Sequence, residues 1–327
     1  MELVVVDNVI TSITVKGTDV RDQVAVHKID RISGNGILGS WSFKDSTHTF
    51  KPLLPLKAGV DYVLTINSWT IEFFSIEKET ADPPEITAFY PTADTIPENL
   101  LKCYIAFSKP MREKEWHKYI SVTDSEGKVV SDVILPLEPG LWNEDRTMLT
   151  CWIDPGRVKR GLKRNRQLGA PIEAGERYTI TISADWQSIN GTPMDSSWKR
   201  SFFVKERAET LTGPESWKIS KPGAGTKDPL TIDFPEPMDF HTTISAFQIK
   251  NGMGAILGES KMGKSEKSWY FTPDNAWKAD TYIIEITPSL EDLAGNSLLR
   301  PFDRDLSKNE KERQKHSTQL TLIIPES

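Results

Sequence analysis

The sequence predicts an all-β protein made of tandem β-sandwich domains, because three kinds of segment recur at intervals of about one hundred residues. An Ala-Gly-x-x-Tyr segment, or the related Ala-Asp-Thr-Tyr, occurs at 58–62, 174–178 and 279–282. A Phe-x-x-Pro-Met segment occurs at 107–111 and 234–238. Strand-like segments that end in proline occur at 41–52, 148–155 and 268–273. The period is too long for a solenoid repeat and suits whole β-domains.

The composition supports this fold class. The 327 residues include 38% hydrophobic residues, 10 Trp and 13 Phe, so two or three domains could each bury a core of their own. The 21 Pro and 20 Gly are spread between short apolar runs, which favours short strands over long helices. The net charge of −6 argues against a nucleic acid or an anionic membrane as partner. No stretch approaches the roughly 18 apolar residues of a membrane span.

Two candidate linkers, residues 81–84 and 206–214, divide the chain into domains 1–82, 83–206 and 207–327. The third domain shows the repeating unit most simply, as a series of short segments that alternate apolar and polar residues. They lie at 229–234, 245–250, 255–257, 268–272, 281–286 and 319–324. Six or seven short strands separated by turn residues indicate a β-sandwich with immunoglobulin-like (Ig-like) connections.

The recurring tyrosine belongs to the penultimate strand of each domain. In sandwiches of this kind a tyrosine at this place often caps a neighbouring turn with its hydroxyl group. It could equally be a plain core aromatic residue. Both interpretations remain open for Tyr282 and its counterparts.

Several of these segments together resemble the tandem bacterial Ig-like domains of S-layer and other envelope proteins. The resemblance is carried by Phe-Ser-x-Pro-Met, the proline-ended strand, Gly-x-x-Tyr and the Glu-Asp-Leu-Ala-Gly-Asn segment at 291–296. It covers the second and third domains well and the first domain in part. It implies a non-enzymatic module of the cell envelope, or a secreted one, that acts as spacer, adhesion or binding module. The alternative is a set of accessory domains from a larger secreted enzyme that acts on polysaccharide. Met1–Asp7 lacks the basic region and long apolar core of a signal peptide.

The first domain departs from the pattern. Its Ile13–Gly17 segment aligns with Phe247–Gly252 of the third domain. Domain 1–82 is therefore expected to lack its first strands, whose counterparts would lie before Met1.

The Asp-x-x-Gly-Asn segment has a physical explanation as a turn. Asp292 can close an Asx turn, and Gly295 accepts a left-handed backbone. The second domain has Ser188–Gly191 at this place, so the carboxylate is lost while the glycine stays. This difference favours turn geometry over a calcium site at Asp292.

Two glycine-rich segments match phosphate-binding patterns but lack the strand–loop–helix setting in which such patterns work. Residues 258–265 fit the P-loop spacing and residues 34–39 fit the dinucleotide fingerprint. Alternating strand-like residues follow each segment, and the two segments align on one hairpin of the repeat. We interpret these glycines as turn glycines. The five histidines are scattered and no nucleophile elbow occurs, so no catalytic residue, cofactor or metal site is predicted.

The two cysteines, Cys103 and Cys151, are too few for a disulfide scaffold. Each alternates with apolar neighbours, so both thiols are expected to point into one core. Buried free thiols are the first interpretation and an inter-strand disulfide is the alternative.

A basic insert at 156–170 distinguishes the second domain from the third. It contains no acidic residue, and its six cationic side chains are Arg157, Lys159, Arg160, Lys163, Arg164 and Arg166. Such a loop on an acidic protein could be solvated, could dock against an adjacent domain, or could bind a polyanion. The partner in the last case would be a cell-wall or extracellular polysaccharide or another envelope protein.

Overall fold

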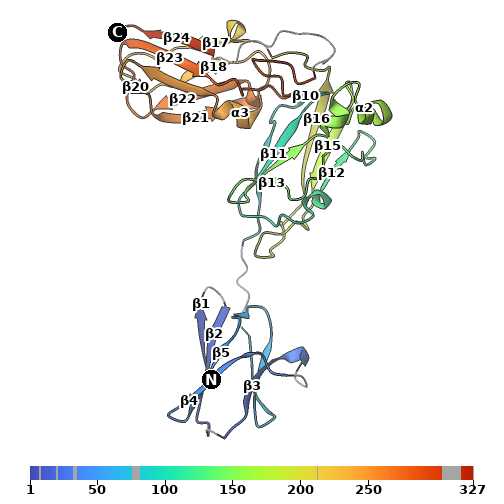
Figure 1. Ribbon diagram of the computed structural model, residues 1–327, viewed down its shortest axis with the longest axis vertical. Coiled ribbons are helices and arrows are strands. Elements are labelled where there is room, and N and C mark those ends of the chain that lie inside the picture. The colour runs from blue at the N-terminus through green and yellow to red at the C-terminus, as the bar shows by residue number, and fades with distance from the viewer. Residues whose placement is uncertain are drawn as a thin grey trace. The chain divides into compact units, whose positions relative to one another are not determined.

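The computed structural model describes residues 1–6, 9–19, 21–31, 35–75, 82–211, 213–303 and 318–326, and consists mainly of strands (Figure 1). The chain divides into two compact units, Met1–Asp82 and Pro83–Ser327. The second unit contains the predicted domains 83–206 and 207–327 together. The described residues form an all-β protein of Ig-like sandwiches, as the sequence predicts.

The first unit is a two-sheet sandwich. Its elements are β1 (Glu2–Val6), β2 (Val9–Lys16), β3 (Val24–Lys28), η1 (Ile29–Arg31), β4 (Gly39–Lys44), β5 (Thr47–Pro52), β6 (Leu56–Lys57), β7 (Tyr62–Ile66) and β8 (Trp69–Phe74). One sheet has the order β1-β2-β5-β4 with β6 beside β2, and the other has the order β3-β7-β8. Ile10, Ile13, Phe50, Tyr62 and Leu64 are buried in its hydrophobic core.

The second unit begins with the second sandwich. Its elements are β9 (Ile86–Tyr90), β10 (Thr95–Pro97), β11 (Lys102–Phe107), η2 (Trp116–Tyr119), β12 (Ile120–Thr123), β13 (Leu141–Trp142), β14 (Met148–Trp152), α1 (Pro155–Val158), α2 (Lys163–Leu168), β15 (Arg177–Ile182) and β16 (Trp198–Lys205). The sheets have the orders β13-β14-β11-β9 and β10-β16-β15-β12.

The third sandwich completes the second unit. Its elements are η3 (Pro214–Ser216), β17 (Lys218–Ser220), β18 (Leu230–Asp233), α3 (Phe240–Ile244), β19 (Phe247–Asn251), β20 (Gly254–Ala255), β21 (Gly258–Met262), η4 (Lys264–Glu266), β22 (Ser268–Pro273), β23 (Asp280–Ile286) and β24 (Thr318–Ile324). The sheets have the orders β17-β18-β22-β21 and β20-β19-β23-β24.

One topology underlies all three sandwiches. Four strands form the first sheet, in the orders β1-β2-β5-β4, β9-β11-β14-β13 and β17-β18-β22-β21. Three further strands are common to the second sheets, in the orders β3-β7-β8, β12-β15-β16 and β19-β23-β24, and β10 and β20 each add an edge strand to one of them. Written in chain order as A to G, these sheets are ABED and CFG, which is the constant-type Ig arrangement.

This topology corrects the sequence interpretation of the first domain. Strands β1 and β2 take the places of β17 and β18, and β3, which pairs with β7, takes the place of β19. The alignment of Ile13–Gly17 with Phe247–Gly252 is therefore wrong, and domain 1–82 does not lack its first strands. The physical reason is that β2 and β19 share a period of two, which marks a half-buried strand but does not say which strand of the fold it is.

The recurring tyrosines cap turns with their hydroxyl groups, so this interpretation is confirmed over that of a plain core aromatic. Tyr62 accepts a hydrogen bond from the backbone N of Lys57 at 3.0 Å and donates to its carbonyl oxygen at 3.3 Å. Tyr282 makes the same pair with Lys278 at 3.1 and 3.2 Å. Tyr178 accepts from the backbone N of Glu173 at 3.1 Å. Each ring thereby ties the loop before its strand to the core, and burial raises the pKa of the Tyr62 and Tyr178 hydroxyls.

The glycines of the two phosphate-like patterns occupy one hairpin position, as predicted. Gly39 pairs with Pro52, and Gly258 pairs with Pro273. They begin strands β4 and β21 rather than turns, and the opposite strand approaches them closely. A Cβ at Gly39 would lie 2.4 Å from Phe50 Cε2, and one at Gly258 would lie 2.3 Å from the Thr272 carbonyl oxygen. Gly34 lies outside the described residues.

The two cysteines are buried in one core, that of the second sandwich, as the sequence predicts, and both are free thiols in this structure. Cys103 on β11 and Cys151 on β14 are directly opposite each other in the antiparallel register.

Candidate functional site at the junction of two sandwiches

The second and third sandwiches meet at a junction in which a turn of the third enters the core of the second. The Leu101 backbone N donates a hydrogen bond to the Leu293 carbonyl oxygen at 2.9 Å. The Leu293 side chain is 5% exposed and belongs to the hydrophobic cluster of the second sandwich. A residue of the third sandwich, Leu293, therefore supplies part of the hydrophobic core of the second sandwich.

The turn that carries Leu293 is the Asp-x-x-Gly-Asn segment. The Asp292 carboxylate accepts hydrogen bonds from the backbone N of Ala294 at 2.8 Å and of Asn296 at 2.9 Å, and from Asn296 Nδ2 at 2.9 Å. Gly295 has a φ of +75°, so the predicted Asx turn with a left-handed glycine is confirmed. A Cβ at Gly295 would also lie 2.4 Å from Leu101 Cδ2, so the junction itself requires glycine there.

The second sandwich builds its counterpart turn without a carboxylate. Ser188 Oγ accepts from the backbone N of Thr192 at 3.3 Å, and Gly191 has a φ of +84°. The two repeated Pro-Met segments end beside these turns, because Met111 forms a β-bridge with Ser188 and Met238 forms one with Asp292. The pairing explains why the Phe-x-x-Pro-Met segment and the turn recur together.

Burial changes the acidity of the turn carboxylate. Asp292 is 5% exposed, and desolvation raises its pKa to about 6. The hydrogen bonds from Asn296 and Ala294 act in the opposite direction and only partly offset the desolvation.

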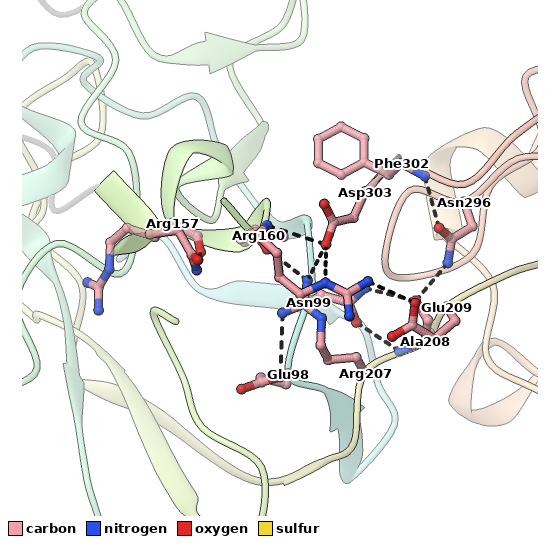
Figure 2. Close-up of polar contacts among 12 residues, drawn as sticks. Glu98, Asn99, Arg157, Arg160, Arg207, Ala208, Glu209, Asn296, Phe302 and Asp303 are labelled. Carbon is pink, nitrogen blue, oxygen red and sulfur yellow. Dashed lines mark hydrogen bonds and ion pairs between the residues drawn. The ribbon is translucent and has the colours of Figure 1, made fainter. Parts of the chain in front are cut away.

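The linker after β16 is held by both sandwiches at Ala208. Asn99 of the second sandwich accepts from the Ala208 backbone N and donates to its carbonyl oxygen, each at 2.9 Å. Asn296 of the third sandwich donates to the same carbonyl oxygen at 3.0 Å (Figure 2). These bonds fix the linker between the two bodies.

The six basic residues of the insert divide into three groups. Arg157 and Arg164 hold the insert to its own sandwich. Arg157 is 7% exposed and donates to five backbone carbonyl oxygens, those of Ser131, Asp132, Leu168, Gly169 and Ala170. Arg164 Nε lies 2.7 Å from Asp154 Oδ2, and Asp154 Oδ1 caps α1 by accepting from the backbone N of Gly156 at 2.8 Å. Figure 2 shows Arg157 turned away from the junction.

Lys159 and Arg160 contact the chain beyond residue 206. Arg160 Nε lies 2.8 Å from Asp303 Oδ2, and its Nη2 lies 2.9 Å from Glu209 Oε2 (Figure 2). The hydrogen bond with Asp303 is the main cause that raises the pKa of Arg160. Lys159 Nζ lies 4.1 Å from the centroid of the Phe302 ring, a cation–π contact.

Lys163 and Arg166 form the third group. Both lie on α2 and are exposed. Within the described ranges neither side chain has a hydrogen bond or ion pair. Unlike the exposed Arg160 and Arg164, they are therefore exposed charges of the insert without a partner in the described part of the chain.

A second arginine strengthens the contact at Asp303. Arg207 Nη2 lies 3.1 Å from Asp303 Oδ2 and donates to the Val158 carbonyl oxygen at 2.8 Å. Its Nη1 lies 3.4 Å from Glu98 Oε2. Asp303, with a side chain 13% exposed, thus meets two guanidinium groups.

The opposite side of the junction contains contacts that sequence reasoning missed. The Tyr90 ring stacks on Phe240 with a centroid distance of 3.7 Å, and the Tyr104 hydroxyl donates to Asp239 Oδ2 at 2.8 Å. Asp239 also caps α3 by accepting from the backbone N of Thr242 at 2.9 Å. Burial raises the pKa of the Tyr104 hydroxyl. The sequence contains one signal of this contact. The alternation that points Cys103 into the core of the second sandwich points Tyr104 to the outer face of the same sheet.

Glu266 is the most buried acid of this side of the junction, at 1% exposed. Its carboxylate accepts from the Thr92 backbone N at 2.9 and 2.8 Å and from Thr92 Oγ1 at 2.6 Å. Burial raises its pKa although these hydrogen bonds act against the shift. Nearby, Lys102 Nζ lies 2.7 Å from Glu291 Oε2. No sequence pattern pairs these residues, since they are far apart along the chain.

The residues of the junction pack and pair with one another, as residues of an interface between two domains do. A groove of about 280 Å³ lies beside the linker and is lined by Lys205, Arg207, Glu236, Asp292 and Leu293, among others. Lys205 and Glu236 form an ion pair across it. In the part of the chain that the structure describes, no group of three or more His, Cys, Asp or Glu side chains could hold a metal ion.

Comparison with known proteins agrees with the fold. Residues 220–307 match the family model described as a bacterial Ig-like domain. No curated protein matches the chain. Among the described residues, no helix has the length and apolarity to cross a bilayer.

The chain is similar to several solved structures at low sequence identity. One is native alpha-2-macroglobulin from Escherichia coli spanning domains MG0-NIE-MG1, with 7% identity over 74% of this chain and 71% of that chain and a TM-score of 0.26. Another is an I-band fragment of titin, with 10% identity over 97% and 93% and a TM-score of 0.22. The chicken CNTN1 FN1–FN3 domains have 8% identity over 97% and 95% and a TM-score of 0.20. The fold assignment therefore rests on the family match and the strand order.

Proposed function

We propose that this chain is a non-catalytic module of a bacterial cell-surface protein, in which the second and third sandwiches act as one stiff spacer. The match of residues 220–307 to a bacterial Ig-like domain supports a binding or spacer role at the surface or outside the cell. Ig-like sandwiches ordinarily carry no active site of their own, so function has to come from sites placed on them. The spacer role is supported by the burial of the Leu293 side chain in the core of the second sandwich.

Contacts at several places of the junction oppose relative motion of the two sandwiches. Tyr90 on Phe240 and Thr92 on Glu266 hold one side, while Arg160 on Asp303 holds another. A large rotation about the linker at Ala208 would have to break these contacts and withdraw Leu293 from the core of the second sandwich. Relative motion is the default for domains in one chain unless their interface is large and apolar, and here a core side chain is shared.

Within this proposal the basic insert is a clasp. Arg157 and Arg164 give the insert a fixed shape, which holds Lys159 and Arg160 toward the third sandwich. The Arg160 side chain is 54% exposed, so its ion pair contributes no more than about 1 kcal/mol. We therefore expect the clasp to restrict the orientation of the third sandwich relative to the second while adding little to the free energy of unfolding. The burial of the Leu293 side chain contributes more to holding the two sandwiches together.

The test is a distance measurement across the junction. Spin labels are attached to Glu126→Cys and Glu259→Cys, both exposed positions. Double electron–electron resonance then measures the distribution of distances between the two labels, and so between the two sandwiches. We expect a narrow distribution that broadens in Leu293→Ala and, less, in Arg160→Ser. Lys163→Ser is the matched control and should leave the width unchanged. A broad distribution in the parent chain would rule out a stiff spacer.

A partner is proposed for the outward face of the insert. Lys163 and Arg166 present positive charge to solvent on a chain of net charge −6, which is suited to an acidic cell-wall or extracellular polysaccharide. Another envelope protein with an acidic surface would use the same charges. A salt-dependent binding measurement, described in the Discussion, tests this part separately from the spacer role.

A further inference from the structure

The two cysteines of the chain are brought together by the fold. The sequence contains only Cys103 and Cys151, so one intramolecular pairing is possible. Strands β11 and β14 place them directly opposite each other, and both side chains lie in the core of the second sandwich. They are 2% and 0% exposed.

The register of the two strands brings the two Cα atoms within the range of a disulfide. Cys103 and Cys151 form a hydrogen-bonded pair of the ladder, because the Ile153 backbone N donates to the Leu101 carbonyl oxygen two residues along. Cα atoms in such a pair are roughly 5.5 Å apart. A disulfide needs a Cα separation of about 4.4–6.8 Å. Burial, and to a smaller extent a hydrogen bond with Cys103, raise the pKa of the Cys151 thiol.

We propose that Cys103 and Cys151 close a disulfide between β11 and β14 when the chain folds in the presence of a disulfide oxidant. The oxidant is a small-molecule or protein disulfide. The thiolate of one cysteine displaces one sulfur of that disulfide, and the thiolate of the other attacks the mixed disulfide. The Sγ–Sγ bond forms, and two protons and two electrons leave the chain as the oxidant becomes two thiols.

The burial of the pair fixes when this exchange takes place. Desolvation raises the pKa of Cys151, so the thiolate that exchange requires is scarce in the folded protein. Solvent does not reach either sulfur in the closed core. Exchange therefore belongs to folding, before the two sheets close over the pair, and the closed bond is shielded from small thiols.

The decisive experiment refolds the full chain from denaturant in a mixture of reduced and oxidised glutathione. We expect an intact mass lower by two hydrogen atoms, no thiol titrated in denaturant, and one peptide in which Cys103 is linked to Cys151. Two titrated thiols, or disulfide-linked dimers in place of the internal bond, would overturn the proposal.

Two further measurements separate a built pair from chance oxidation. Folded, reduced protein incubated in the same glutathione mixture should stay reduced, because its thiols are buried. Oxidised parent should melt about 5–15 °C above reduced parent. The Cys103→Ala, Cys151→Ala double variant should show no such dependence on reductant. An oxidised parent that melts at or below the reduced parent would show that the register does not accommodate the bond, and would also overturn the proposal.

Discussion

Arg160 and Asp303 form an ion pair across the junction, with 2.8 Å between Nε and Oδ2. The arginine comes from an insert in the second sandwich, and the aspartate follows the Asn296 turn of the third. Asp303 also accepts from Arg207 at 3.1 Å, so it is the acid on which two segments of the second unit converge. The junction therefore depends on specific pairings and not on the net charge of either body.

The first prediction compares two charges of one loop. Arg160→Ser should lower the free energy of unfolding by about 0.5–1 kcal/mol, because it removes a partly exposed ion pair. Lys163→Ser, the matched control, should change it by less than about 0.5 kcal/mol. Urea unfolding of the full chain measures both. Equal effects of the two substitutions would mean that Arg160 is as solvated as Lys163.

The second prediction concerns two glycines with nearly the same backbone conformation. Gly295 has a φ of +75° and Leu101 Cδ2 within 2.4 Å of its ideal Cβ, whereas Gly225 has a φ of +80° and nothing within 4 Å. Gly225→Ala should cost about 1 kcal/mol from backbone strain alone. Gly295→Ala should cost about 1–3 kcal/mol more, because the methyl group overpacks the junction.

A double variant checks the cause of that difference. Leu101→Ala removes the atoms that the new methyl group would meet, so the extra cost of Gly295→Ala should largely vanish in the Leu101→Ala background. If the extra cost persists there, the contact with Leu101 is not its origin.

The third prediction concerns pH. The pKa of Asp292 is about 6 in the folded chain against an ordinary value of 3.8, because burial disfavours the charged carboxylate, so the folded state holds this proton more tightly than the unfolded state. The resulting stability is fully present below about pH 4 and is lost as pH rises through about 6, at most about 3 kcal/mol. Glu266, whose pKa is also raised by burial, contributes in the same direction.

Asp292→Ser isolates the contribution of Asp292, because the second sandwich builds the equivalent turn on Ser188. The fall in unfolding free energy between pH 4.5 and pH 7.5, followed by urea titration, should be smaller in Asp292→Ser than in the parent. An unchanged fall would assign the pH dependence to other groups.

The fourth prediction tests the outward charges of α2. The full chain should bind polygalacturonate, an acidic polysaccharide, and binding should weaken severalfold between 50 and 200 mM salt, where screening lengths shorten below about 14 Å. Lys163→Ser combined with Arg166→Ser should remove most of the binding without changing stability. Binding that resists both salt and the double substitution would exclude this surface.

Local pattern predicted more of the fold than of the junction. Alternation and turn residues marked the strands, and Asp292 and Gly295 were readable as a turn because the interactions that build it lie within five residues. Period two could not tell β2 from β3 as the counterpart of β19, since strands of one fold share that period. Tyr104 was readable as an outward residue but its partner Asp239 was not. The six charges of the insert looked alike in sequence, and only the fold separates the buried Arg157 from the exposed Lys163.

The place of Leu293 has a consequence for the order in which the chain is made. Synthesis proceeds from the N-terminus, and domains generally fold as they emerge. The second sandwich, however, takes one of its core side chains from residue 293, which follows its last strand by most of another domain. A nascent chain that ends after β16 would carry an open site at Leu101. On the ribosome, the second sandwich therefore reaches its final packing only after most of the third, up to Leu293, has been translated.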